Sequence, residues 1–320
     1  SSIIRHILEH SVGCNYFIGA GDGHATKDNK YFVVESDEFN KHFLHYKPTY
    51  SIITYIEEEH MECYRDLDDI KESFTKFANQ TKDLVIANGD LENIRSLKID
   101  KTLYYGFDDN NDIVIKDSIT TDKGSMFKLY DGDNLIGEFY IPLYGMHNVM
   151  NATAAILMAI YLKVDINKIK EALETFVNAA RRFVLIEEKK NVIIDDYAHH
   201  PTEIKATLKA ARNKYKDKKI IAIFKPNVYS RFVNFKDQYI EAFNEADYTY
   251  LTKVESNRER YEDYVGYDSN IITDVCSNCS LLNEKDMSVL KEYKDVCFVV
   301  MSCADVANII DVLKEYNNEK

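Results

Sequence analysis

The sequence predicts an α/β protein built from two domains. Its 320 residues are too many for one hydrophobic core of ordinary size and suit two. From residue 192 onward, short apolar runs alternate strictly with amphipathic segments, which is typical of a doubly wound, Rossmann-like parallel sheet. Before that point, strands and helices are interrupted between 112 and 141 by short β runs that predict an antiparallel meander. We place the domains at 1–183 and 184–320.

The elements of the first domain follow from the spacing of its apolar residues. Helical spacing predicts helices over 1–10, 66–78, 147–162 and 167–176, and short apolar runs predict strands over 31–34, 51–54 and 84–88. The first of these helices has no strand before it to pack against. We therefore expect this domain to be incomplete at its N-terminal end.

The second domain alternates strand and helix with short connections. Strands are expected over 192–194, 220–224, 248–252 and 296–301, and helices over 202–214, 232–244 and 304–316. The domain contains no G-x-G-x-x-G, so dinucleotide binding is not indicated.

Charge and composition exclude several classes of protein. The net charge of −13 argues against a nucleic-acid partner, which normally requires a basic face. No run approaches 18 apolar residues and the N-terminus lacks the order of a signal peptide, so we expect no membrane partner and a cytoplasmic location. The six cysteines are scattered, and Cys276 and Cys279 form a lone C-x-x-C, so all are expected to be free thiols.

Polar residues gather directly after the strand expected over 192–194. Asp195, Asp196, Tyr197, His199 and His200 supply acceptors, a donor and titratable nitrogens within one short segment. This segment lies at the carboxyl end of a strand, which is where ligands bind in open α/β sheets. The alternative is that one aspartate caps the following helix and the histidines lie at the surface.

Two further groups of polar residues lie in the first domain. The segments Glu35–Glu38 and Glu57–His60 follow two expected strands, so we expect their oxygen and nitrogen ligands to gather at one sheet edge, as in a metal–nucleotide site; the alternative is an exposed acidic loop. His147, Asn148 and Asn151 open the Ala-rich helix, with the histidine and the second asparagine on one face. The alternative there is a simple asparagine cap.

The amino-acid sequence of these segments resembles that of the Mur ligase family. The matching segments are V-E-S-D-E at 34–38, Y-I-E-E-E-H at 55–60, G-M-H-N-V-M-N at 145–151, R-R-F at 181–183, D-D-Y-A-H-H-P-T-E at 195–203 and P-N-V-Y-S-R at 226–231. The resemblance implies a central ATPase-type α/β domain followed by a Rossmann-like C-terminal domain. It also implies an ATP-dependent amide ligase. R-R-F and F-L-H-Y at 43–46 favour the members that add L-alanine to UDP-N-acetylmuramate in peptidoglycan precursor synthesis.

The resemblance also implies a role for each matching residue. Glu35 and His60 would hold Mg²⁺, although imidazole suits Mn²⁺ equally well. The nucleotide would be contacted by His147, Asn148, Asn151, Arg182 and Asp196, with Arg182 at the terminal phosphate. In the second domain, Tyr197 would bind substrate, His199 would face the reaction centre, and Arg231 would pair with the carboxylate of the amino acid. Arg182, His199 and Arg231 are therefore the expected catalytic residues.

The chain departs from the family pattern in several places. The phosphate-binding loop G-x-x-G-K-T/S is absent from the 320 residues, and the resemblance places it, with the UDP-binding domain, before Ser1. We therefore expect this chain alone neither to hydrolyse ATP nor to ligate alanine. Tyr55, Asn227 and the segment 302–304 also differ from the family wording. They motivate an alternative function, that of a non-catalytic homologue that only binds. The oligomeric state is not indicated.

Overall fold

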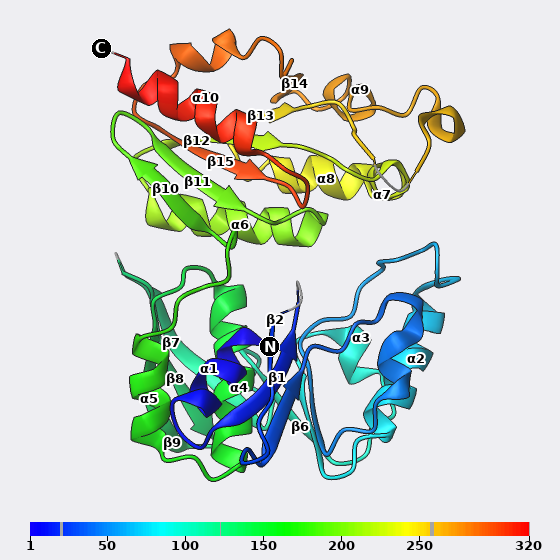
Figure 1. Ribbon diagram of the computed structural model, residues 1–320, viewed down its shortest axis with the longest axis vertical. Helices are drawn as coiled ribbons and strands as arrows, with labels where there is room; N and C mark the ends of the chain where they lie inside the picture. Colours follow the sequence, from blue (N-terminus) through cyan, green and yellow to red (C-terminus); the bar gives the residue numbers. More distant parts are fainter. Residues whose placement is uncertain (20–21, 122, 257–258, 320) are drawn as a thin grey trace. The chain divides into compact units, whose positions relative to one another are not determined.

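The computed structural model describes residues 1–19, 22–121, 123–256 and 259–319. The chain folds into two compact units, Ser1–Val177 and Asn178–Lys320 (Figure 1). Arg181 and Arg182, which we expected at the end of the first domain, therefore lie at the start of the second unit.

The first unit is organised on a mixed sheet with the order β4-β5-β6-β7-β8-β9. Strands β4 to β7 pair in parallel, and β7, β8 and β9 form the predicted antiparallel meander. A smaller sheet has the order β2-β1-β3. The elements of the unit are α1 (Ser2–Glu9), β1 (Cys14–Ile18), β2 (Asp22–His24), β3 (Tyr31–Val34), η1 (Phe39–His45), β4 (Tyr50–Ile53), α2 (Leu67–Asn79), β5 (Leu84–Asn88), α3 (Glu92–Arg95), β6 (Thr102–Gly106), β7 (Ile113–Thr120), β8 (Ser125–Asp131), β9 (Asn134–Ile141), α4 (Met146–Tyr161) and α5 (Ile166–Glu174).

Two hydrophobic cores hold this unit together. The larger joins α1, α4 and α5 to the sheet, and Ala152, Ala155 and Ala159 let α4 approach the strands closely. The smaller lies under α2 and α3, against Ile53, Val85 and other residues of β4 and β5. The apolar stripes that predicted these helices are therefore the faces that they bury.

One expectation about the first unit is wrong. We expected the strands that precede Glu35 and His60 to end at one edge of the same sheet. Instead, β3 pairs with β1 in the smaller sheet, and β4 pairs with β5 in the larger one. Both strands are only four residues long and are joined by a connection that includes η1, so their apolar runs alone did not determine which neighbour each would take.

The second unit has the predicted doubly wound sheet, in the order β10-β11-β15-β12-β13-β14. Strands β11 to β15 are parallel, and β10 is an antiparallel edge that we did not predict. The helix expected over 232–244 is divided at Phe235, whose φ of −111° and ψ of 22° lie outside the helical region. The elements are β10 (Val184–Glu188), β11 (Val192–Asp196), α6 (Pro201–Lys214), β12 (Lys219–Phe224), α7 (Tyr229–Asn234), α8 (Lys236–Phe243), β13 (Tyr248–Leu251), η2 (Tyr261–Tyr264), α9 (Asn270–Thr273), β14 (Cys279–Leu281), η3 (Ser288–Glu292), β15 (Val296–Met301) and α10 (Ala307–Asn318).

Helices cover both faces of this sheet (Figure 1). Alternate residues of β11 point to opposite faces: Val192 and Ile194 pack with α6 and α8, whereas Ile193 packs with α10. Strand β15 lies between β11 and β12, although it is last in the sequence. The carboxyl ends of these three strands are therefore neighbours. The candidate site lies at this end of the sheet, which we call the sheet edge below.

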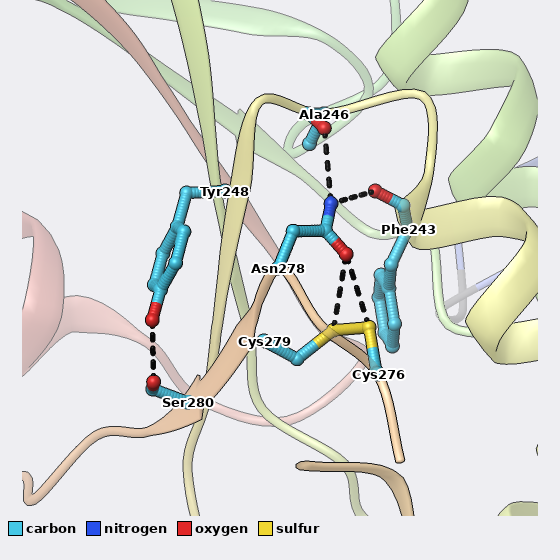
Figure 2. The surroundings of a disulfide bond; sticks show 7 residues. All are labelled: Phe243, Ala246, Tyr248, Cys276, Asn278, Cys279 and Ser280. Carbon is cyan, nitrogen blue, oxygen red and sulfur yellow. Dashed lines mark hydrogen bonds between the residues drawn. A yellow bond between two sulfur atoms is a disulfide. The ribbon is translucent and has the colours of Figure 1, made fainter.

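The expectation that all cysteines are free thiols is wrong for one pair. Cys276, in the segment that follows α9, forms a disulfide with Cys279, the first residue of β14 (Figure 2). Both are buried, and their Cα atoms are 5.3 Å apart, within reach of a disulfide. Asn278 lies beside the bridge and donates its amide to the carbonyl oxygens of Phe243 and Ala246. The bridge thus closes the turn that leads into β14.

Hydropathy adds one observation on the helices. Among the described residues, no helix is both long enough and apolar enough to cross a membrane.

Candidate functional site

The arginine pair at 181 and 182 lies beside the end of β11, but the two side chains are used differently. Arg181 donates from Nε to Asp195 (3.1 Å to Oδ2), from Nη1 to the carbonyl of Ala304 (2.8 Å) and from Nη2 to the carbonyl of Ser302 (2.8 Å). Asp195 is buried, and Ser302 and Ala304 follow β15. Arg181 thus ties the end of β11 to the loop after β15.

Arg182 is the more exposed of the two, with 44% of its side chain accessible. Its guanidinium lies 5.1 Å from the ring centroid of Tyr197, and its Nη1 lies 3.4 Å from Glu203 Oε1. Because Arg181 is engaged with backbone carbonyls, Arg182 is the member of the pair that is placed to reach a ligand. That Arg182 meets a phosphate stays a prediction.

Asp196 is buried beneath this segment, with 5% of its surface exposed. Its two carboxylate oxygens accept hydrogen bonds from the backbone N–H of Phe183 (2.6 Å) and of Ala198 (2.7 Å). Burial raises the pKa of Asp196 to about 6, against the opposing effect of these hydrogen bonds and of Arg182. Both oxygens of Asp196 are thus already engaged, and its predicted contact with a nucleotide would use the remaining lone pairs.

His199 lies at the other side of Tyr197, with the two rings edge to face at 5.6 Å. Its Nδ1 lies 3.0 Å from the carbonyl oxygen of Tyr197 and 3.1 Å from Glu203 Oε2. Two acceptors at one ring nitrogen indicate that Nδ1 carries a proton. Arg182, Tyr197, His199 and Glu203 form one cluster at the start of α6, which we call the Glu203 cluster.

Sequence reasoning did not single out Glu203. Its position was the available signal, because it is the third residue after the helix N-cap His200, where a glutamate forms a capping box. Burial alone would raise its pKa, but the charges of His199 and Arg182 and the nearby backbone N–H groups outweigh burial and lower it. Glu203 is therefore ionised at neutral pH.

Arg231 lies on α7, which follows the carboxyl end of β12. Cys303, in the loop after β15, lies in the same neighbourhood: burial raises its pKa, while the charge of Arg231 and a hydrogen bond with Asn227 act in the opposite direction. Asn227, Arg231 and Cys303 thus come together from the ends of adjacent strands. The predicted amino-acid-binding arginine lies at the same sheet edge as the Glu203 cluster.

In the first unit, His60 pairs with Glu38 of the V-E-S-D-E segment. Its Nε2 lies 3.2 Å from Glu38 Oε1, and its ring lies edge to face with Phe39 at 5.2 Å. Burial disfavours the charged imidazole, but the carboxylates of Glu38, Glu59 and Glu62 outweigh it and raise the pKa of His60. Glu38 is thus a second residue that sequence reasoning missed, although it lies in the motif that pointed to Glu35.

The donor types of the predicted pair, Glu35 and His60, are ones that a divalent cation accepts. Glu35 is exposed at the end of β3, and Mg²⁺ is commonly bound by one or two carboxylates together with waters and phosphate oxygens. Both ring nitrogens of His60 lie near carboxylates, Nε2 beside Glu38 and Nδ1 3.6 Å from Glu62 Oε1, and its role as a metal ligand stays a prediction. Within the described parts of the chain, no three histidine, cysteine or acidic residues are grouped as a metal site.

The first two turns of α4 present the predicted nucleotide-binding residues in two directions. Asn148 is buried and donates its amide to the carbonyl of Tyr144 (2.8 Å), which supports the turn before the helix. His147 and Asn151 are exposed, four residues apart on one face. Gly145 precedes them with φ of +93°, a conformation that glycine adopts readily. His147 and Asn151 are therefore the members of this group that can meet a ligand.

Comparison with known proteins gives matches over most of the chain. Residues 10–159 match the model of the Mur ligase middle domain, and residues 181–297 match that of the Mur ligase glutamate ligase domain. The UDP-N-acetylmuramate–L-alanine ligase of Lactiplantibacillus plantarum is 38% identical over 308 residues, which cover 96% of this chain and 70% of the relative. The enzyme of the same name from Streptococcus equi subsp. zooepidemicus is 37% identical and has 69% of its length covered.

Solved structures agree in fold. UDP-N-acetylmuramate-alanine ligase MurC from Thermotoga maritima superposes with a TM-score of 0.75 at 22% identity, covering 100% of this chain and 73% of that chain. The MurF ligase from Thermotoga maritima in complex with ADP has a TM-score of 0.75 at 17% identity, covering 99% and 76%. Because two family models match and the sequence identity to curated ligases is well above 30% over nearly the whole chain, the protein belongs to the Mur ligase family.

Proposed function

We propose that the chain carries the nucleotide-binding and amino-acid-binding parts of an ATP-dependent ligase that joins L-alanine to UDP-N-acetylmuramate in peptidoglycan precursor synthesis. The observation that carries this proposal is the 38% identity to a curated ligase of that name over 96% of the chain. In the proposed reaction, ATP phosphorylates the muramate carboxyl group. The amine of alanine then displaces the phosphate, which gives the amide, ADP and phosphate.

The second unit supplies the residues that would handle charge during this reaction. Arg182 would bind the terminal phosphate of ATP, where negative charge develops during phosphoryl transfer. Arg231 would pair with the carboxylate of alanine and so orient its amine. Tyr197 and His199 would face the substrates from the start of α6. Asp196 would contact the nucleotide, or act on it through the backbone of Phe183 that it holds.

The first unit would hold the adenine nucleotide and its metal. His147 and Asn151 are exposed on the first two turns of α4, and Asn148 supports the turn before the helix through the carbonyl of Tyr144. Glu35 and His60 would hold Mg²⁺ or Mn²⁺, which would neutralise phosphate charge.

Equilibrium binding tests these assignments one ligand at a time. Isothermal titration of the 320-residue chain should detect ATP and ADP in the presence of Mg²⁺, and L-alanine in a separate titration. Arg182→Ala should weaken ATP more than ADP, because ADP lacks the phosphate that Arg182 is proposed to meet. Arg231→Ala should weaken L-alanine and leave both nucleotides unchanged. The proposal would be contradicted if the wild-type chain bound neither nucleotide, or if it did not bind L-alanine.

Turnover is a separate question. The 320 residues contain no G-x-x-G-K-T/S segment, so we expect no ADP release from this chain with all substrates present. Metal-dependent ADP release that disappears in Arg182→Ala would overturn that expectation.

A further inference from the structure

Glu203 contacts both predicted catalytic groups of its cluster through different oxygens. Oε2 accepts the backbone N–H of His199 (3.0 Å) and of His200 (3.2 Å), and lies 3.1 Å from Nδ1 of His199. Oε1 lies 3.4 Å from Nη1 of Arg182. One carboxylate therefore joins an arginine that comes before β10 to a histidine that comes before α6.

The position of Glu203 in its helix explains why this carboxylate is well fixed. It occupies the third position of α6, where it closes a capping box with His200. The positive end of the helix dipole also favours a negative charge there. Because Oε2 is held by two backbone N–H groups, Oε1 is held at a constant place relative to the helix. Any partner of Oε1 is thereby placed relative to the sheet edge.

Arg182 has two contacts that restrict its guanidinium, the Glu203 carboxylate and the ring of Tyr197. The same tyrosine ring contacts His199. The neighbouring Arg181 also lies near this ring, 5.6 Å from its centroid, but its donors are used by Asp195 and by two backbone carbonyls and not by Glu203. Arg181 thus supports the loop after β15, whereas the guanidinium of Arg182 is held by the Glu203 carboxylate.

We propose that Glu203 is a positioning residue that holds the Arg182 guanidinium in the orientation that receives the terminal phosphate of ATP. This inference rests on the proposed function, because it assumes that Arg182 meets that phosphate. Glu203 itself touches no substrate in this proposal. Its effect is on the preference of the chain for ATP over ADP, which only the terminal phosphate can create.

Glu203→Gln separates the two functions of the side chain. The amide oxygen of glutamine can keep the hydrogen bonds that Oε2 makes at the start of α6, whereas its NH₂ group cannot accept from Arg182. Glu203→Ala removes both the acceptor for Arg182 and the cap of α6. Glu241→Gln is a matched control. Glu241 lies on α8, outside the Glu203 cluster, and its carboxylate pairs with Lys205 of α6, the helix that carries Glu203.

The measurements are the dissociation constants of ATP and ADP with Mg²⁺ and the melting temperature of the full 320-residue chain. In Glu203→Gln, we expect the ATP-over-ADP preference to fall by about two- to fivefold, the range for a partly exposed ion pair. The ADP affinity and the melting temperature should stay at their wild-type values. Arg182→Gln should lower the ATP-over-ADP preference at least as far. Adding Glu203→Gln to Arg182→Gln should not lower it further. Glu241→Gln should behave like the wild type.

Three results would overturn the proposal. Equal weakening of ATP and ADP in Glu203→Gln would assign Glu203 to general structure. An unchanged preference would leave Arg182 independent of Glu203. A further loss in the double variant would show that the two residues act separately. If the wild-type chain binds neither nucleotide, the proposed function itself fails and this inference fails with it, whereas the other three results leave nucleotide binding intact.

Discussion

Replacing Arg181 with alanine should destabilise the second unit much more than the same change at Arg182. The Arg181 guanidinium satisfies the buried carboxylate of Asp195, of which 8% of the side chain is exposed, and the carbonyl oxygens of Ser302 and Ala304. Arg181→Ala leaves all three acceptors without this donor. A buried acceptor left unsatisfied costs about 1–3 kcal/mol, and more when it is charged.

The expected size of the effect follows from the exposure of the pair. Removing one partner of a buried ion pair costs about 3–5 kcal/mol, but 28% of the Arg181 side chain is exposed, so water replaces part of what is lost. We therefore expect Arg181→Ala to lower the free energy of unfolding by about 3 kcal/mol. The Arg182–Glu203 pair is exposed at both ends, so Arg182→Ala should cost below about 1 kcal/mol.

Urea denaturation measures this difference. Two units that unfold separately give two transitions, so the affected transition should be assigned by hydrogen exchange of amides in β11 and β15. Arg182→Ala is the matched control, since it removes the same side chain one residue along. A loss in Arg181→Ala no greater than that in Arg182→Ala would refute the assignment of Arg181 as the structural arginine.

Two other predictions concern the second unit. Replacing both Cys276 and Cys279 with serine should lower the free energy of unfolding by about 2 kcal/mol, as expected for a disulfide that closes a very short loop, and a reducing agent should then have no further effect on urea denaturation. Burial raises the pKa of Asp196 to about 6 in the folded chain, so the folded state binds a proton more tightly than the unfolded state, and stability should fall as pH rises from about 4 to about 6. The stability of the wild type relative to Asp196→Asn should fall by about 3 kcal/mol over that range, and a flat difference would contradict the raised pKa.

The helices and the central strands could be predicted because their signals are local. Strand β5 lies where its apolar run predicted it, and α2 and α6 lie within one residue of their predicted bounds. Their apolar residues repeat with the period of the element, and capping residues such as Asp66 mark where a helix begins. The doubly wound sheet of the second unit followed from the same alternation.

Strand partners and edge strands could not be predicted in this way. The four-residue strands β3 and β4 have similar apolar runs, yet they join different sheets. Strand β10 pairs antiparallel at an edge, and its burial does not alternate clearly, so its sequence lacked the pattern of a half-buried strand. Partner choice depends on residues far away in the chain, which local periodicity does not record.

The sequence by itself determined the family and the identity of the residues that could carry its chemistry, because motifs such as D-D-Y-A-H-H-P-T-E and R-R-F are read directly from neighbouring residues. Only the tertiary structure decided how those residues are used. Arg181 and Arg182 are adjacent and chemically identical, and they differ only because β15 inserts between β11 and β12 and brings the carbonyls of Ser302 and Ala304 within reach of one of them. Glu203 joins Arg182 to His199 because β10 pairs antiparallel with β11 and so returns Arg182 to the start of α6, a pairing that the sequence did not predict.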